Sequence, residues 1–326
     1  MTSADYINYS VRPNKAVERK LIFEVLSGLS PILDLPSYRY IGFGGLWFVD
    51  FIMAHKYLMI EDMISIERNE ILASRAEFNK PYACIKVIHG DSEEVLSDLE
   101  LEELPLLVWL DYNSGLEGSV LQDLSTLCGR ARTGSTILVT INAHRGSLPT
   151  KDESNREYEN FSDRMRSLAG DLIPDELPKE AEQKSGYPPY LVSVLFTHIH
   201  RQMRKAGRES ESFLPLFNIG YSDNAPMVTL GGAIVNEPCK QNIRTVLEDG
   251  GMREFLDQQR HLQIGVPPLT FKEKASLDQL LPKVSPPTEQ DVNELGFKLK
   301  PSHINAYHSF YRHYRKRGGR GTRLSA

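Results

Sequence analysis

The chain has 326 residues, of which 25% are charged and 40% hydrophobic, and its net charge is −5. This composition is ordinary for a soluble globular protein, and the length allows one large domain with additions or two smaller ones. The apolar runs are broken by glycine and aspartate before they could span a bilayer, and the N-terminus lacks the basic and apolar regions of a secretion signal, so we expect no membrane segment.

The three cysteines, Cys84, Cys128 and Cys239, lie far apart and show no C-x-x-C spacing. This pattern argues against a zinc site and against a disulfide framework. A reducing, cytoplasmic location is the simplest expectation.

The first predicted element is a helix within residues 15–29, which belongs to a helical lead over residues 1–35. Its apolar residues recur at helical spacing: Val17, Leu21, Ile22, Val25 and Leu29. A short apolar strand at 39–42 follows this helix and begins the next part of the chain.

A glycine-rich turn comes directly after this strand and contains Gly42, Phe43, Gly44 and Gly45. Glycine lets the backbone turn tightly and approach a ligand closely. A helix near 46–58 and a second strand at 63–67, ending on Glu67, complete a unit that can hold a nucleoside, because an acid at this position can bind a ribose diol. The spacing G-x-G-G does not match the dinucleotide fingerprint, and a tight turn without a ligand explains the motif alone equally well.

Three further apolar strands, at 85–91, 106–111 and 136–141, alternate with helices near 69–79, 92–99 and 116–131. This alternation is typical of a parallel, doubly wound sheet. Three strands end on an acid, namely Glu67, Asp91 and Asp111. Ligands of such sheets bind beyond the carboxyl ends of the strands, although Asp91 could equally cap the helix that follows it.

The region 149–188 is polar and predicts a helix near 154–169 within an exposed insertion. A helix then runs from Pro188 to about Lys205, followed by two strands at 213–219 and 227–235 that form an antiparallel hairpin. His198 and His200 could share a metal on a strand, but on a helix they diverge. We therefore expect no metal site.

Residues 238–314 predict a helical extension, in which Thr270 and Glu273 fit a capping box. The last helix carries one aromatic stripe, Tyr307, Phe310, Tyr311 and Tyr314, which is either a packing face or a platform for stacking nucleic-acid bases. From Phe297 onward there are eight lysine and arginine residues and no acids. The basic tail at 315–326 therefore either binds nucleic-acid phosphates or is a solvated terminus.

Residues 36–237 resemble a class I S-adenosylmethionine-dependent methyltransferase in their layout and in the positions of their motifs. The resemblance implies a Rossmann-like, mainly parallel sheet of seven strands with a terminal antiparallel hairpin. It also implies that the loop from Gly42 to Gly45, including Phe43, flanks the methionine part of the cofactor. Glu67 would bind the ribose hydroxyls and Asp91 would lie near the adenine amino group. The fourth-strand motif, Asp111 to Ser114, would face the methyl group and the acceptor.

Two features depart from this family. The first motif usually carries an acid that meets the ammonium group of the cofactor, and here the nearest acid is Asp50 on the following helix. The prolines of base-modifying amino-methyltransferases are absent after Asp111. Asp111 is the expected proton acceptor, Tyr112 the expected packing surface for a flat acceptor or the cofactor, and His144 a second candidate base.

The sequence therefore predicts a methyltransferase that acts on a hydroxyl or amine acceptor. The alternative is a catalytically inactive protein on the same fold, with a nucleic-acid or protein partner. A nicotinamide-dependent oxidoreductase fits less well, because the glycine spacing is wrong and the hairpin is unusual for that fold. The acceptor and the oligomeric state stay open.

Overall fold

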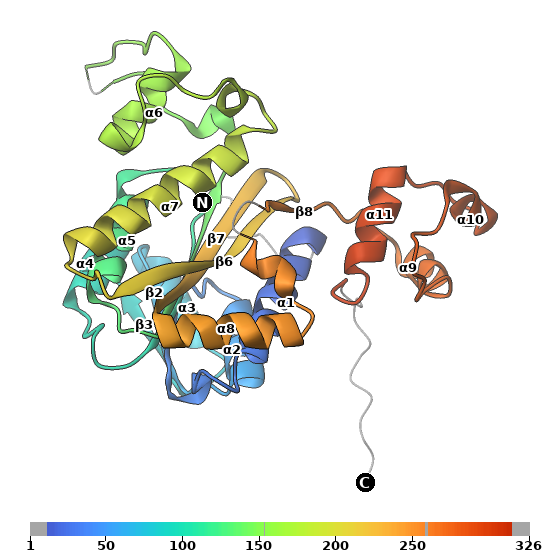
Figure 1. The fold of residues 1–326 in the computed structure, drawn as a ribbon, viewed down its shortest axis with the longest axis horizontal. Helices are drawn as coiled ribbons and strands as arrows, with labels where there is room; N and C mark the ends of the chain where they lie inside the picture. The colour runs from blue at the N-terminus through green and yellow to red at the C-terminus, as the bar shows by residue number, and fades with distance from the viewer. Residues whose placement is uncertain (1–11, 153, 258–259, 315–326) are drawn as a thin grey trace. The chain divides into compact units, whose positions relative to one another are not determined.

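The structure is a computed structural model that describes residues 12–152, 154–257 and 260–314 (Figure 1). The chain divides into two compact units. The larger unit comprises Ile22–Gly220 and Ala225–Leu262, and the smaller one comprises Met1–Leu21, Tyr221–Asn224 and Gln263–Ala326. The basic tail at 315–326, for which the sequence left open nucleic-acid binding or a solvated terminus, lies outside the described residues.

The larger unit is built on a mainly parallel sheet, which confirms the predicted fold class. The strands are β1 (Arg39–Gly42), β2 (Asp62–Glu67), β3 (Ile85–His89), β4 (Leu106–Asp111), β5 (Thr136–Asn142), β6 (Glu211–Ser222), β7 (Pro226–Asn236) and β8 (Leu262–Ile264). The last two residues of β6 and of β8 belong to the smaller unit. Their order across the sheet is β3-β2-β1-β4-β5-β7-β6-β8. Strands β1 to β5 are parallel, and β7 runs antiparallel to β5.

The sequence predicted seven strands, and the structure adds an eighth, β8, at the edge of the sheet. This strand has only three residues. A three-residue segment is too short to show the period-two pattern by which a strand is recognised. The hairpin of β6 and β7 forms as predicted, and both strands extend a few residues beyond the predicted bounds.

Helices cover the two faces of the sheet, and the alternation of side chains along each strand decides which helix each residue meets. The helices of the larger unit are α1 (Pro13–Gly28, shared with the smaller unit), α2 (Val49–Leu58), α3 (Glu70–Asn79), α4 (Ser92–Asp98), α5 (Gly118–Arg130), α6 (Phe161–Ala169), α7 (Tyr187–Lys205) and α8 (Glu237–Asp249). In β4, Val108 and Leu110 belong to the core shared with α4, α5 and α7, whereas Trp109 packs against Phe23 of α1.

The helix predicted near 154–169 is shorter than expected. Helix α6 begins at Phe161, and the side chain of Asn160 caps it by accepting a hydrogen bond from the Asp163 amide. The preceding polar residues form loops with one isolated bridge between Lys151 and Glu157. Helix α7 matches its prediction closely, so His198 and His200 lie on a helix, as expected from the pattern.

The smaller unit contains α9 (Phe271–Asp278), α10 (Glu289–Glu294) and α11 (Pro301–Phe310). The predicted capping box of Thr270 and Glu273 is present. Tyr307, Phe310 and Tyr314 are buried, and the Tyr307 hydroxyl donates a hydrogen bond of 2.7 Å to Asp278. The aromatic stripe is therefore a packing face, and these three rings are not a platform for stacking bases.

Within the described ranges, no helix is both long and apolar enough to cross a membrane.

Candidate active site

The order of the strands reverses between β1 and β4, which lie side by side in the sheet. At such a point, the connections that follow the two neighbouring strands run to opposite sides. Ligands of open α/β sheets bind there, beyond the carboxyl ends of the two strands. Gly42 at the end of β1 is in register with Ser65 of β2 and Trp109 of β4. Glu67 and Asp111 lie two residues further along these strands, so they flank the loop that begins at Gly42.

The glycine loop is shaped by contacts within the protein. A Cβ atom on Gly44 would lie 2.6 Å from the ring of Phe48, and one on Gly42 would lie 2.8 Å from the Trp109 carbonyl oxygen. Gly44 also donates its amide to Ser65 Oγ over 3.1 Å. Gly45 differs, because its φ of +53° favours glycine and, apart from its two chain neighbours, no residue of the protein has an atom within 4 Å of the place its Cβ would take. Open space therefore adjoins the backbone at Gly45.

Asp50, the acid nearest to this loop, is buried in the first turn of α2. A carboxylate at that position interacts favourably with the helix dipole. Phe48 precedes the helix with a φ of +48°, and its ring packs edge-on against Phe51. No acid lies within the glycine loop itself, as the sequence already shows.

Glu67 and Asp91 lie at the ends of neighbouring strands. Glu67 Oε1 accepts a hydrogen bond of 2.9 Å from the Asn69 amide, and its Oε2 has no hydrogen-bond partner in the described part of the chain. Asp91 occupies the N-cap position of α4, but its side chain makes no capping hydrogen bond. Its only described ion pair is a long, exposed one of 3.8 Å to Arg68. Both carboxylates thus retain oxygens that a ligand can use.

Tyr112, directly after Asp111, is held by a buried polar cluster that the sequence did not reveal. Its hydroxyl donates to Oδ2 of Asp123 on α5, and the Ser92 hydroxyl donates to the same oxygen. Asp123 is 0% exposed, and burial raises the pKa of its carboxyl group. Burial, followed by the nearby Asp123 charge, raises the pKa of Tyr112 well above its usual value. Tyr112 therefore stays protonated at neutral pH, and its ring packs on Phe43 with centroids 5.1 Å apart.

One feature of the α5 sequence indicates this cluster, namely an acid on the buried face of the helix. Asp123 lies on the buried face of the helix together with Val120, Leu124 and Leu127. An acid within an apolar stripe is unusual because a buried charge is costly unless it is hydrogen-bonded. Such a residue predicts donors on the facing elements, although it does not identify them.

Asp111 is half-buried at the end of β4, in register with Thr140 of β5. The loops after these two strands contact each other, since the Asn142 amide donates to the Ser114 carbonyl over 2.8 Å. His144 is exposed, and its Nδ1 lies 3.1 Å from the Gly146 amide, which donates to it. The strand topology thus brings Asp111 and His144 to the same edge of the sheet.

Among the described residues, no group of three or more His, Cys, Asp or Glu side chains is arranged to hold a metal ion. His198 is buried and lies 3.0 Å from Ser125 Oγ and 2.9 Å from the Leu121 carbonyl oxygen. His200 is exposed on the same helix. The two histidines do not share a site.

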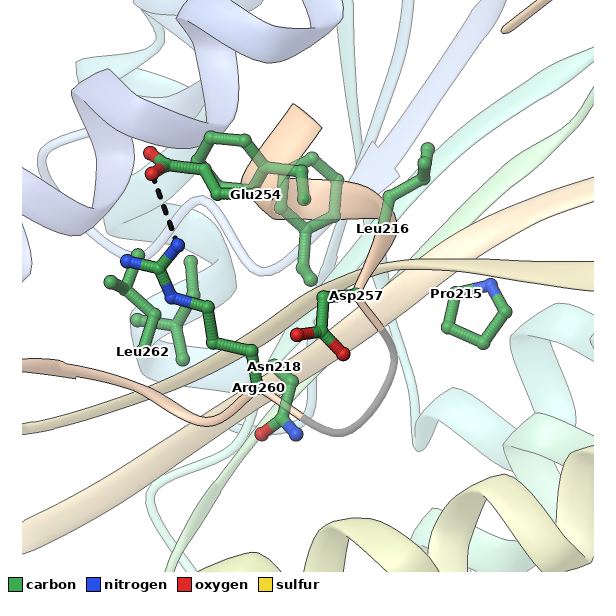
Figure 2. A pocket seen from close by; sticks show the side chains of 10 residues that line it. Pro215, Leu216, Asn218, Glu254, Asp257, Arg260 and Leu262 are labelled. Atoms are coloured by element: carbon green, nitrogen blue, oxygen red, sulfur yellow. Dashed lines mark hydrogen bonds and ion pairs between the residues drawn. The ribbon is translucent and has the colours of Figure 1, made fainter. Parts of the chain in front are cut away.

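A small cavity lies away from this edge, between β6 and the segment before β8 (Figure 2). Its volume is about 20 Å³, which is enough for roughly one water molecule. Glu254 and Arg260 form an ion pair of 3.2 Å beside it. The cavity is too small for a cofactor and belongs to the outer part of the sheet, so it is not the active site.

Residues 7–316 match a protein family described as "Putative O-methyltransferase". The chain belongs to this methyltransferase family. The match covers nearly the whole chain, and it confirms the predicted methyltransferase. The oxidoreductase interpretation is therefore wrong. A comparison with curated proteins finds no match to this methyltransferase.

Solved structures of other methyltransferases are similar to this chain at low identity. Trm1 from Pyrococcus horikoshii, in complex with S-adenosylmethionine, is 13% identical with a TM-score of 0.46 and is matched over 76% of this chain and 61% of its own. A structure from Klebsiella pneumoniae described as "a putative O-methyltransferase" is 13% identical with a TM-score of 0.39, over 71% of this chain and 84% of its own. A structure described as "Putative methyltransferase yhhF from Escherichia coli" is 16% identical with a TM-score of 0.31, over 41% of this chain and 73% of its own.

Proposed function

We propose that this methyltransferase transfers the methyl group of S-adenosylmethionine to an acceptor hydroxyl at the edge formed by β1, β2 and β4. The observation that carries the proposal is the placement of Glu67 and Asp111 on either side of the glycine loop, at the reversal of strand order. The family description favours oxygen as the acceptor atom over the amine that the sequence left open. A cytoplasmic location is part of the proposal and rests on the three free cysteines.

The residues at this edge fit the cofactor. The open space at Gly45 accommodates a ligand close to the backbone, and Gly42, Phe43 and Gly44 form the rest of that wall. The unpartnered Oε2 of Glu67 is suited to a ribose hydroxyl. The carboxylate of Asp91, which does not cap its helix, is suited to an amino group of adenine. When bound, the cofactor supplies a methyl group already activated by a sulfonium leaving group.

Asp111 and Tyr112 take the roles beside the acceptor. Asp111 would orient the acceptor hydroxyl and take up its proton, and the cofactor would supply the methyl group with its sulfur as the leaving group. Tyr112 does not act as a base, because its protonated hydroxyl is bound to Asp123. Its ring, fixed against Phe43, forms part of the wall of the site. His144 is a second candidate for the proton acceptor.

Calorimetry with S-adenosylhomocysteine and with NAD tests the cofactor. We expect saturable binding of S-adenosylhomocysteine and none of NAD. Glu67→Gln should weaken that binding about tenfold or more, since a hydrogen bond to a charged group is lost. Glu61→Gln is the matched control, because Glu61 is an exposed acid just before the opposite end of β2. Equal affinity of both variants for the cofactor product would show that the site lies elsewhere.

A further inference from the structure

One buried carboxylate lies behind three of the loops that border the proposed site. Asp123, in the middle of α5, is 0% exposed, and its Oδ2 accepts hydrogen bonds from the hydroxyls of Ser92 and Tyr112. Ser92 is the first residue of α4 and follows Asp91 directly. Tyr112 follows Asp111, the last residue of β4. One oxygen atom therefore joins the loop after β3 to the loop after β4.

The third loop is the glycine loop after β1. The ring of Phe43 packs edge-on against the ring of Tyr112, with centroids 5.1 Å apart and an angle of 78° between the planes. Because an edge-on pair has a preferred geometry, the position of one ring restricts the position of the other. The hydrogen bond to Asp123 thus holds Tyr112, and Tyr112 in turn supports Phe43. The loops after β1, β3 and β4 are linked to α5 through a single side chain.

This arrangement places two loops, but it is costly for the stability of the fold. The Oδ1 atom of Asp123 is buried and has no hydrogen-bond partner among the described residues. Burial raises the pKa of Asp123, and its two hydrogen bonds only partly oppose that rise. A buried carboxyl group with one unsatisfied oxygen offsets much of what its hydrogen bonds contribute to stability. What Asp123 adds is a shared acceptor, which brings hydroxyls from two different loops to one atom.

We propose that Asp123 is a positioning residue for methyl transfer, which holds the loops of Asp91 and Tyr112 in the arrangement that binds S-adenosylmethionine. This inference rests on the proposed function, in which Asp91 meets the adenine and Tyr112 borders the acceptor. Asp123 itself touches neither ligand, because no part of it is exposed. Its effect reaches the site through Ser92 and Tyr112, whose hydroxyls lose their shared acceptor when Asp123 is replaced. A misplacement of about 1 Å caused by a distant substitution can cost about 10²-fold in rate.

Calorimetry with S-adenosylhomocysteine, at a temperature where all variants are folded, compares Asp123→Ala with Leu127→Ala. Leu127 lies one helical turn further along α5, is 0% exposed and belongs to the apolar core, so its truncation destabilises the fold without removing a hydrogen bond. We expect Asp123→Ala to bind S-adenosylhomocysteine about tenfold or more weakly than the wild type, and Leu127→Ala to keep the wild-type affinity. Asp123→Asn retains an oxygen that can accept both hydrogen bonds, and it should restore most of the affinity.

Hydrogen–deuterium exchange of the unliganded protein tests the positioning without the cofactor. Asp123→Ala should raise the exchange rates of backbone amides several-fold in three segments, at residues 43–45, 90–93 and 111–114, because local opening of these loops becomes easier. Leu127→Ala should leave these segments at their wild-type rates. The two arms of the cluster should also separate. Ser92→Ala should affect only the segment 90–93, whereas Tyr112→Phe should affect the other two.

Failure of this inference and failure of the proposed function give different results. The positioning role is refuted, and the proposed function stands, if Asp123→Ala binds S-adenosylhomocysteine like the wild type or if Leu127→Ala loses as much affinity. It is also refuted if the three segments exchange at wild-type rates in Asp123→Ala. If these segments loosen in Asp123→Ala but the wild type does not bind S-adenosylhomocysteine, the proposed function is overturned, and Asp123 is left as a residue that only fixes the loops.

Discussion

Replacing Asp123 with alanine tests whether the buried cluster beneath Tyr112 stabilises the larger unit. Asp123 is fully buried and accepts hydrogen bonds from the hydroxyls of Tyr112 and Ser92. A buried hydroxyl left without an acceptor costs about 1–3 kcal/mol. Ser92 and Tyr112 are both partly buried, so water can replace part of each lost hydrogen bond. Burial disfavours the charged carboxylate, so its removal offsets part of this cost. We expect the free energy of unfolding to fall by about 2 kcal/mol.

Urea and thermal unfolding followed by circular dichroism measure this change. A loss of about 2 kcal/mol corresponds to a fall in melting temperature of roughly 4–8 °C for a unit of this size. Asp98→Ala is the matched control, because Asp98 is an exposed acid at the end of α4. Tyr112→Phe completes a double-mutant cycle in which the two changes should couple by about 0.5–3 kcal/mol. Strict additivity, or wild-type stability of Asp123→Ala, would refute the reasoning.

Four other changes have defined outcomes. Glu67→Ala should weaken binding of S-adenosylhomocysteine by about 1–3 kcal/mol in calorimetry, and unchanged affinity would contradict the ribose role. Asp111→Asn should lower turnover by about 10²–10⁴-fold while the affinity for S-adenosylhomocysteine stays near that of the wild type; full turnover would exclude a role as base. Gly44→Ala should destabilise the fold by about 1–3 kcal/mol in urea unfolding, because its Cβ would lie 2.6 Å from the ring of Phe48. Burial raises the pKa of Asp123, so protonation of this carboxyl group stabilises the folded state. This stabilisation is complete below the pKa of the unfolded state, about 3.9, and is lost as the pH rises through the pKa of the folded state. Asp123→Asn should abolish this part of the pH dependence of the free energy of unfolding.

The sheet could be predicted because its strands are short apolar runs separated by helices of recognisable period. In β4, all residues from Leu106 to Leu110 are buried, which is the pattern of a parallel strand covered on both faces. Strand β8 could not be predicted, since three residues beside an irregular segment carry no period. The start of α6 was predicted too early because polar residues before Asn160 suit a helix and a loop equally well.

The division into units could not be read along the chain. The first half of α1 belongs with the C-terminal helices, and Asn14 illustrates why, because its side chain accepts a hydrogen bond from the Val266 amide over 2.8 Å. Asp223 accepts hydrogen bonds from the amides of Asn14 and Lys15, each over 3.1 Å. These contacts join residues more than 200 positions apart, and a single sequence contains no local signal for them.

The candidate residues could be predicted from their positions at strand ends, but the hydrogen-bond partners of their polar atoms could not. Glu67 and Asp91 retain usable oxygens, whereas the Tyr112 hydroxyl and the Gly44 amide already have partners. Sequence position predicts which residues border the crevice because parallel strands bring their carboxyl ends to one edge. The partner of each polar atom depends on helix packing, which the strand pattern does not determine.

In the glycine loop, the polar atoms that already have partners limit how a cofactor can bind. Its Gly44 amide is bound to Ser65 and its Gly44 carbonyl oxygen accepts the Phe48 amide, so these two groups fix the loop and are not available to a ligand. The loop carries no acid to meet the ammonium group of the cofactor, and Asp50 lies on the helix beyond it. If Glu67 and Asp91 bind the adenosine as proposed, cofactor affinity depends more strongly on these two residues than it does in relatives with the acid. On the acceptor side of the proposed site, the Tyr112 ring packs on Phe43 and its hydroxyl donates to Asp123, so two contacts hold this ring in place.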